Sequence, residues 1–311
     1  MKIICIVPVY NDWPSLERLV SEIETTVVQK GDEVEIVIVN DGSSEQVKPE
    51  LFPASIPVKV INLNLNVGHQ RAICIGLSFV YDTYDHYDVV VVMDSDGEDK
   101  PSDIRQLASE AQNHGFSKII FAKRKRRTER MIFKIFYYLY RFVFNVLTGK
   151  LISFGNFSCI PQNLLNSIVS SPASWNHYSG SILKSKLPYE TISLDRGERY
   201  FGKSKMGLMN LIIHGLSSIS IYLEVVSVRL LIFSFLGMLL ALSSILFVFS
   251  IRLFTDYAIP GWASNISLLI FNILIQFFVI SLVIVLLILF NRNNLQPAPK
   301  NFYREFIHSI I

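Results

Sequence analysis

The sequence predicts an α/β domain with a mostly parallel sheet, followed by two helices that cross a membrane. Short apolar runs rich in β-branched residues alternate with amphipathic helical segments in residues 1–128, and the last third holds two long runs without a charged residue. Continuous apolar strands joined by helices are typical of a parallel sheet that is covered on both faces. Long uncharged runs are typical of membrane spans.

Four apolar runs are predicted to be strands, and a fifth, weaker run follows them. The first run resembles a signal peptide but contains Pro8 and lacks a small-residue cleavage site, so we interpret it as a buried strand. The strands are expected at residues 3–8, 34–40, 58–63, 89–94 and 118–123, and the helices at residues 14–29, 69–84 and 102–113.

The two spans are predicted at residues 230–251 and 266–290. Each exceeds the roughly 20 residues that cross a bilayer core. Basic residues lie in the N-terminal domain and after the second span, whereas the linker between the spans has none beyond Arg252. The positive-inside rule therefore places both termini in the cytoplasm. We expect a cytoplasmic domain at residues 1–225, the spans within residues 226–291 and a cytoplasmic tail at residues 292–311.

Two further segments, residues 130–147 and 205–222, are predicted to be interfacial helices. In the first, polar side chains recur at spacings of four, seven and four, which aligns them in one stripe of a helix that is otherwise apolar and aromatic. Such a helix suits the headgroup layer of a membrane, and packing on the protein's own core is the alternative. The stripe consists of Arg130, Lys134, Arg141 and Asn145.

Polar residues follow three of the predicted strands, at Asn11-Asp12, Asn40-Asp41 and Asp94-Ser95-Asp96. Ligands of parallel sheets bind beyond the carboxyl ends of the strands, so these groups are expected to share one site. Gly68 opens the helix after the third strand and would let a backbone approach a ligand closely.

The acidic run at residues 94–99 has several interpretations. An EF-hand is excluded because its sixth and twelfth positions are Asp99 and Arg105 instead of Gly and Glu. A solvated turn before a helix, whose start Pro101 and Asp103 suit, stays open, and Asp99 is interpreted as one more helix-start acid. A carboxylate pair of a glycoside hydrolase also stays open. The fourth interpretation is a D-x-D site, in which Asp94 and Asp96 hold Mg²⁺ or Mn²⁺ against the phosphates of a nucleotide.

Other classes of protein find little support. A net charge of +3 is too small to indicate nucleic-acid binding. The chain contains neither a G-x-G-x-x-G nor a P-loop motif, which argues against dinucleotide folds and P-loop enzymes. The three cysteines form no C-x-x-C pair and have no His at zinc-ligand spacing.

Several motifs, taken together and in order, resemble those of polyprenyl-phosphate glycosyltransferases. These are membrane-anchored members of glycosyltransferase family 2, of the dolichol-phosphate mannose synthase type, with a GT-A fold. The resemblance runs from residue 3 to about residue 290 and includes both spans. Its motifs are IVPVYND, VNDGS, NVGHQRA, MDSDGEDKP, FAKRKRR, ERYFGKSKMG and IPGWAS.

The resemblance implies roles for individual residues. Asp94 and Asp96 match the catalytic D-x-D pair, with Asp96 the expected ligand of Mg²⁺ or Mn²⁺. Glu98 stands where the family usually has Gln and is expected to help hold the metal. Donor contacts are implied for Pro8, Tyr10, Asp12, Asp41 and Asp94, and contacts to the phosphates or the acceptor for Arg124, Arg127, Arg199, Ser204 and Lys205.

The chain departs from the family at Asn156, which occupies the position of an Asp that is a candidate catalytic base. The implied activity is inverting transfer of one sugar from a nucleotide-diphosphate sugar to a polyprenyl phosphate on the cytoplasmic face of a bacterial inner membrane. A family 2 transferase acting on a hydroxyl group of another lipid or glycan is the alternative, and a non-catalytic scaffold is disfavoured by the retained D-x-D pair. Self-association into a homo-oligomer stays open.

Overall fold

The computed structural model describes residues 1–28, 31–45, 52–124, 131–150, 154–202, 215–254, 261–293 and 297–311. The strands are β1 (Lys2–Val9), β2 (Glu33–Asn40), β3 (Val58–Leu63), β4 (Val89–Val92), β5 (Ile119–Arg124), β6 (Ser158–Pro161), β7 (Tyr189–Leu194) and β8 (Ile307–Ile310). The α-helices are α1 (Trp13–Thr26), α2 (His69–Thr83), α3 (Ile104–Asn113), α4 (Met131–Thr148), α5 (Gln162–Val169), α6 (Tyr178–Lys184), α8 (Leu223–Phe254), α9 (Trp262–Asn293) and α10 (Pro299–Phe302). Short 3₁₀ helices are η3 (Pro101–Asp103), η4 (Pro172–Trp175) and η5 (Tyr303–Phe306).

The chain divides into two compact units. The α/β unit comprises Met1–Leu139, Leu151–Ile221 and Gln296–Ile311, and the helical unit comprises Tyr140–Lys150 and Tyr222–Leu295.

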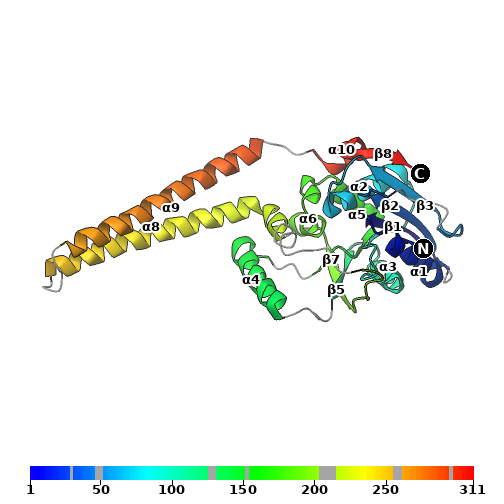
Figure 1. Cartoon of the computed structure of the whole chain (residues 1–311), viewed down its shortest axis with the longest axis horizontal. Coiled ribbons are helices and arrows are strands. Elements are labelled where there is room, and N and C mark those ends of the chain that lie inside the picture. Colours follow the sequence, from blue (N-terminus) through cyan, green and yellow to red (C-terminus); the bar gives the residue numbers. More distant parts are fainter. Residues whose placement is uncertain are drawn as a thin grey trace. The chain divides into compact units, whose positions relative to one another are not determined.

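One mixed sheet forms the centre of the α/β unit (Figure 1). Its strand order is β7-β5-β6-β4-β1-β2-β3-β8. The pairs β1–β2, β1–β4, β2–β3 and β5–β7 are parallel. Strand β6 runs antiparallel to both β4 and β5, and β8 runs antiparallel to β3. The predicted mixed, mostly parallel sheet is therefore confirmed.

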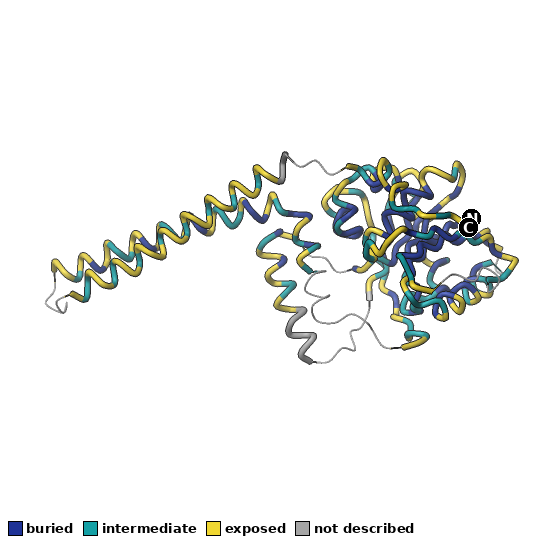
Figure 2. Tube along the Cα trace, turned by 45° about the horizontal axis from the view of Figure 1, so that its top comes forward, coloured by how far each residue is buried: buried dark blue, intermediate teal, exposed yellow. Residues whose placement is uncertain are grey.

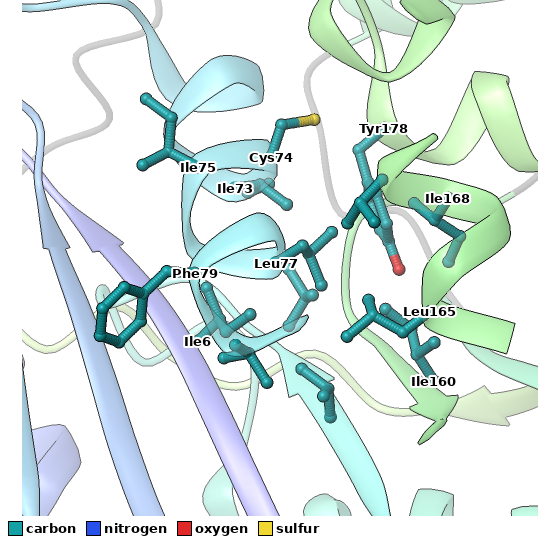
Figure 3. Packing of buried hydrophobic residues seen from close by; sticks show 14 of the residues in the cluster. Ile6, Ile73, Cys74, Ile75, Leu77, Phe79, Ile160, Leu165, Ile168 and Tyr178 are labelled. Atoms are coloured by element: carbon teal, nitrogen blue, oxygen red, sulfur yellow. The ribbon is translucent and has the colours of Figure 1, made fainter. Parts of the chain in front are cut away.

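Both faces of this sheet are buried, because successive side chains of a strand point to opposite faces. On one face, Ile4 and Ile6 of β1 pack in a cluster with α2, α5 and α6. Figure 3 shows this layer, where Leu77 of α2 lies near Leu165 of α5. On the other face, the alternate residues of β1 pack against α1 and α3.

The predicted strands and helices of residues 1–113 are confirmed to within a few residues, except that the fourth strand ends at Val92. Strands β6, β7 and β8 were not predicted. Strand β6 is short and its sequence, SCIP, carries no alternating pattern, while β7 mixes polar and apolar residues at the edge of the sheet. A short strand recruited by its neighbours leaves little signal in its own sequence.

Residues 297–311, expected as a tail, form part of the α/β unit. Strand β8 pairs with β3, and the side chain of Tyr303 is buried, with its hydroxyl donating to Asp82 Oδ2 at 2.9 Å. Trp175 Nε1 donates to the carbonyl of Pro297 at 3.1 Å. This segment therefore completes the sheet on the β3 side.

In the helical unit, α8 and α9 lie side by side and contain the two predicted spans (Figure 1). Each is long and apolar enough to cross a membrane. Most of their surface is exposed, as Figure 2 shows by the yellow and teal residues along both helices. Exposed Leu, Ile and Phe side chains along two such helices indicate an apolar surrounding.

Helix α4 covers nearly all of the first segment that was predicted to be interfacial. Its Tyr138, Leu139 and Phe142 side chains are exposed, whereas Phe144 is buried and meets the Tyr222 ring edge-on, with 6.1 Å between the ring centroids. The second such segment, residues 205–222, lies outside the described residues up to residue 214, and residues 215–220 are helical.

Candidate active site

The loops that follow β1, β2, β4 and β7 meet at one edge of the sheet, together with the segment that precedes β6. The backbone N–H of Asn11, after β1, donates to Ser43 Oγ, after β2, at 2.9 Å. Arg199, after β7, lies 3.2 Å from Asp96, after β4. The polar strand ends noted in the sequence therefore do share one site.

The acidic run folds into a tight turn whose own carboxylates close it. Asp99 Oδ2 accepts from the backbone N–H of Asp94 at 3.0 Å, and Asp96 Oδ1 accepts from the backbone N–H of Glu98 at 3.0 Å. Gly97 supplies the positive φ of 86° that the turn requires. The helix start predicted at Pro101 and Asp103 is confirmed by η3, whose first-turn acid is Asp103, so the interpretation of Asp99 as a helix-start acid is wrong.

Cationic side chains from the segment after β7 face this turn. The Arg199 guanidinium lies 3.2 Å from Asp96 Oδ2 and 3.8 Å from Asp12 Oδ2, and Arg196 forms an ion pair with Glu98. Burial and the neighbouring Asp94 carboxylate raise the pKa of Asp96, although both arginines oppose the shift. The turn thus concentrates negative charge that a cation stabilises.

Two glycines let the segment after β7 lie directly against the acidic turn. A Cβ atom on Gly197 would lie 2.2 Å from the carbonyl oxygen of Gly97, and one on Gly97 would lie 2.6 Å from the Tyr200 ring. The backbone N–H groups of Gly197 and Tyr200 donate to the carbonyls of Glu98 and Asp96, both at 2.9 Å. The turn and this segment therefore form one packed layer.

The sequence predictions missed Arg196, Gly197 and Tyr200 as members of this layer. Tyr200 also donates through its hydroxyl to Glu22 Oε2 of α1 at 2.5 Å, and the Arg18 guanidinium stacks 4.4 Å above its ring. The one signal in the sequence was that these residues lie close to Arg199, which was predicted. Their contact with residues 94–98 becomes visible only when the fold places them after a strand of the same sheet.

Asp41, predicted to contact the nucleotide, is only 4 % exposed. Its two carboxylate oxygens accept from the backbone N–H groups of Val67, at 2.7 Å, and Gly68, at 3.0 Å. Burial raises the pKa of Asp41, and the two backbone hydrogen bonds oppose that shift. Asp41 therefore fixes the start of α2 beside the site, and each oxygen keeps further acceptor capacity for a ligand.

Asn156, at the position of the family's candidate base, lies beside His69 at the start of α2. Asn156 Nδ2 is 3.2 Å from His69 Nε2, and His69 Nε2 is 3.2 Å from Asp94 Oδ1. Burial lowers the pKa of His69, but the carboxylates of Asp94, Asp99 and Asp41 outweigh it, so the net shift is upward. His69 was not predicted as a site residue, although it belongs to the motif NVGHQRA.

The remaining predicted residues are placed as follows. Pro8 is buried within β1 opposite Val39 of β2, whereas Tyr10 is 49 % exposed at the sheet edge. Asp12 accepts from Ser15 Oγ at 2.7 Å near the start of α1. Arg124 is the last residue of β5, and its side chain, like the whole of Arg127, Ser204 and Lys205, lies outside the described residues.

A cavity of about 50 Å³ lies at this edge of the sheet, between the ends of β4, β5 and β7 and the start of β6. Acidic, basic and neutral polar side chains line it, among them Asp94, Glu98, Lys123, Asn156 and Arg196. The cavity thus brings residues of the acidic turn together with Asn156 and with Arg196 of the segment after β7.

The donor set of the turn fits a hard divalent cation. Among the residues that the structure describes, no group of three or more His, Cys, Asp or Glu side chains forms a complete cage. Mg²⁺ in nucleotide sites is usually held by one or two carboxylates and completed by substrate phosphates. Asp96 and Asp94 would be such a pair, and the Arg199 guanidinium lies 3.2 Å from Asp96.

Comparisons with known proteins agree with this architecture. The model of the family described as "Glycosyl transferase family 2" matches residues 4–163. An undecaprenyl-phosphate 4-deoxy-4-formamido-L-arabinose transferase from Photorhabdus laumondii subsp. laumondii is 27% identical over 219 residues, covering 68% of this chain and 65% of the relative. The chain thus matches slightly less than two thirds of that relative's length.

Two solved structures resemble the α/β fold. Mannosyl-3-phosphoglycerate synthase from Rubrobacter xylanophilus matches with a TM-score of 0.52 at 15% identity, covering 71% of this chain and 72% of that one. Glucosyl-3-phosphoglycerate synthase from Mycobacterium tuberculosis, in complex with Mn²⁺, UDP and glucosyl-3-phosphoglycerate, matches with a TM-score of 0.50 at 16% identity, covering 72% and 79%. At these identities the likeness concerns the fold, and it confirms the predicted GT-A class.

Proposed function

This chain belongs to glycosyltransferase family 2, and we propose that it transfers one sugar from a nucleotide-diphosphate sugar to a polyprenyl phosphate. The observation that carries the proposal is the acidic turn of Asp94 and Asp96, faced by Arg199, in a chain that also has two helices of membrane-spanning length. The undecaprenyl-phosphate sugar transferase among its relatives supports the choice of acceptor.

The donor would lie along the edge of the sheet, with its base near the loops that follow β1 and β2 and its diphosphate at the acidic turn. Tyr10 and Asp12 line the first of these loops, and Asp41 begins the second. Asp96 and Asp94 would hold Mg²⁺ or Mn²⁺, with Glu98 beside them. The cation, when bound, offsets the negative charge of the departing diphosphate.

Arg199 would also stabilise the departing diphosphate. Its guanidinium pairs with Asp96 and Asp12, and this position beside the turn supports a contact with the diphosphate. A planar guanidinium with several donors suits phosphate oxygens. We expect Arg199 to exchange a carboxylate for the diphosphate when the donor binds, and so to stabilise the leaving group. Arg124, Arg127, Ser204 and Lys205 are proposed to add contacts to the phosphates or the acceptor.

A polyprenyl phosphate needs no catalytic base. The second pKa of a phosphate monoester is about 6, so the acceptor is already a dianion at neutral pH. Its oxygen would attack the anomeric carbon, the bond from that carbon to the diphosphate oxygen would break, and the nucleoside diphosphate would leave with the electron pair. No proton has to move, which makes Asn156 acceptable where a hydroxyl acceptor would call for a carboxylate.

The membrane would bring the lipid phosphate to the site. We propose that α8 and α9 span the bilayer with the α/β unit in the cytoplasm, in a bacterial inner membrane. The exposed aromatic and aliphatic side chains of α4, among them Tyr138 and Phe142, would lie in the headgroup layer. Residues 205–222 are proposed as a second interfacial segment.

The test is sugar transfer by membranes that contain the full chain. Labelled nucleotide sugars are supplied with Mg²⁺ or Mn²⁺ and an added polyprenyl phosphate, and the lipid phase is then extracted with organic solvent. We expect label in that phase from one donor, dependent on the cation and released by mild acid, because a glycosyl phosphate is acid-labile. Acid-stable label would indicate a hydroxyl acceptor, and absence of label from every donor would refute the proposal.

A further inference from the structure

Residues 305–309, beyond the second long helix, contact Asn62 of β3 and Asn64 of the loop that follows it, and both lead to the loop that holds Asp41. We propose that this segment positions the loop of residues 40–44 for the nucleotide, with Ser309 and Asn62 as positioning residues. The inference rests on the proposed function, since residues 40–44 are the expected base-binding loop. It assigns a role to a part of the chain that lies outside the residues matched by the family model.

The first connection is a row of polar side chains across three strands. Asn40 of β2 is the register partner of Asn62 of β3, and Asn62 is the register partner of Ser309 of β8. Asn62 Nδ2 donates to Ser309 Oγ at 3.1 Å, and Asn40 Nδ2 donates to Asn62 Oδ1 at 2.9 Å. Asn40 Oδ1 in turn accepts from the backbone N–H of Ser43 at 3.0 Å.

These hydrogen bonds point in one direction, from the loop toward β8. Each amide uses its carbonyl on the loop side and its NH₂ group on the β8 side, so each bond polarises the next one. The row continues beyond Ser43, because Ser43 Oγ accepts from the backbone N–H of Asn11 at 2.9 Å and Asn11 Oδ1 accepts from Ser44. The loops after β1 and β2 are thus joined to each other and to β8.

The second connection runs through the backbone of residues 64–68. The backbone N–H of Asn64 donates to the carbonyl of Phe306 at 2.9 Å, and its side-chain Nδ2 donates to the carbonyl of Glu305 at 3.1 Å. The same loop holds Asp41 through the N–H groups of Val67 and Gly68. It also packs against Gly42, where a Cβ atom would lie 2.6 Å from the backbone nitrogen of Asn66.

The segment that makes these contacts is itself firmly attached to the α/β unit. Tyr303 and Arg304 both donate to Asp82 of α2, and Lys300 donates to Asn166 of α5 at 2.9 Å. Because this fixed segment holds Asn62 and Asn64, which connect to the loop of residues 40–44 from two sides, it restricts the conformations of that loop. A ligand that binds one of the remaining conformations then binds more tightly, because the loop loses less conformational entropy on binding.

The experiment measures nucleotide binding by the full chain in detergent, using calorimetry with a panel of nucleoside diphosphates and Mn²⁺. The Ser309→Ala variant removes one acceptor at the end of the row and is expected to raise the Kd of the bound nucleotide about fivefold, typical of one lost hydrogen bond. The Ser309→Thr variant keeps a hydroxyl and is expected to restore binding. His308→Ala is the matched control, since His308 is the exposed neighbour of Ser309 in the same strand.

A double-mutant cycle with Asn62→Ala tests whether the row acts as a unit. If Ser309 acts through Asn62, the double variant binds no more weakly than Asn62→Ala alone, because the interaction is already lost. Additive losses of binding free energy in the double variant would contradict a role of Ser309 through Asn62. Equal Kd values for Ser309→Ala and His308→Ala would refute the inference outright.

Hydrogen exchange separates this inference from the proposed function. The N–H groups of residues 43 and 44 are expected to exchange faster in Ser309→Ala than in His308→Ala, while those of α2 stay equally protected. If the wild-type chain bound no nucleoside diphosphate, the proposed function would fail. Equal exchange at residues 43 and 44 in both variants would refute the positioning role whether or not a nucleotide binds.

Discussion

The α/β unit and the pair of long helices, α8 and α9, use the same apolar side chains in opposite ways. Leu19 of α1 is fully buried against the sheet, whereas Leu240 of α8 is 69 % exposed. The α/β unit covers both faces of its sheet and so removes its apolar surface from water by itself. The two helices contact each other and leave the rest of their apolar surface for a surrounding that is equally apolar. The same hydropathy therefore produces a core in one region and a membrane-facing surface in the other.

The largest expected effect is on sugar transfer, which should depend on the α/β unit, whereas membrane association should depend on α8 and α9. Replacing Asp96 with Asn keeps the acceptor for the Glu98 N–H but removes the charge that faces Arg199. We expect sugar transfer to fall at least about a hundredfold, the scale seen when one preorganised electrostatic group is lost. The fraction of the protein that sediments with membranes should not change.

Asp85→Asn is the matched control, because Asp85 is exposed and lies before β4, at the opposite end of that strand. Its transfer rate should equal that of the wild type. Full activity of Asp96→Asn would show that the site has been placed wrongly. Loss of membrane association in Asp96→Asn would show that catalysis and membrane binding are not divided between the α/β unit and the two helices.

A pair of identical substitutions tests the contrast in packing. Leu19→Ala should destabilise the α/β unit by about 2–5 kcal/mol, the usual cost of a cavity in a core. Leu240→Ala should change the stability much less, since an exposed side chain leaves no cavity behind. Urea unfolding of the full chain in detergent, followed by the fluorescence of the tryptophans, measures both. Similar losses for the two variants would mean that Leu240 packs against a partner chain.

The smallest expected effect concerns a charged residue near the start of α8. Arg229 Nη1 donates to the carbonyl of Val146 at 2.6 Å, at the carboxyl end of α4. A cation at that end caps free carbonyls and complements the helix dipole. Arg229→Met should therefore destabilise the last turn of α4 by about 1 kcal/mol.

Hydrogen exchange at residues 140–148 is the measurement for this variant. Exchange should accelerate in Arg229→Met and stay unchanged in Arg252→Met, which alters an exposed arginine at the other end of α8. Equal exchange in both variants would show that α4 holds its last turn without Arg229.

The sequence by itself determined the features that depend on local patterning. The β-branched runs of β1, β2 and β4 and the uncharged stretches inside α8 and α9 follow from residue type and spacing, because burial on both faces or in lipid demands continuous apolar residues. Asp94, Asp96 and Asp41 were found as candidates because polar groups at the ends of parallel strands converge.

Only the tertiary structure decided which distant groups meet. It placed His69 beside Asn156 and Asp94, laid Arg196 and Tyr200 over the acidic turn, and joined Ser309 to Asn62. These contacts depend on the strand order and on glycines such as Gly97 and Gly197. At each of these glycines another segment of the chain lies so close that a Cβ atom would not fit. Strand β8 likewise forms because β3 offers it a free edge, a condition that residues 307–310 do not encode.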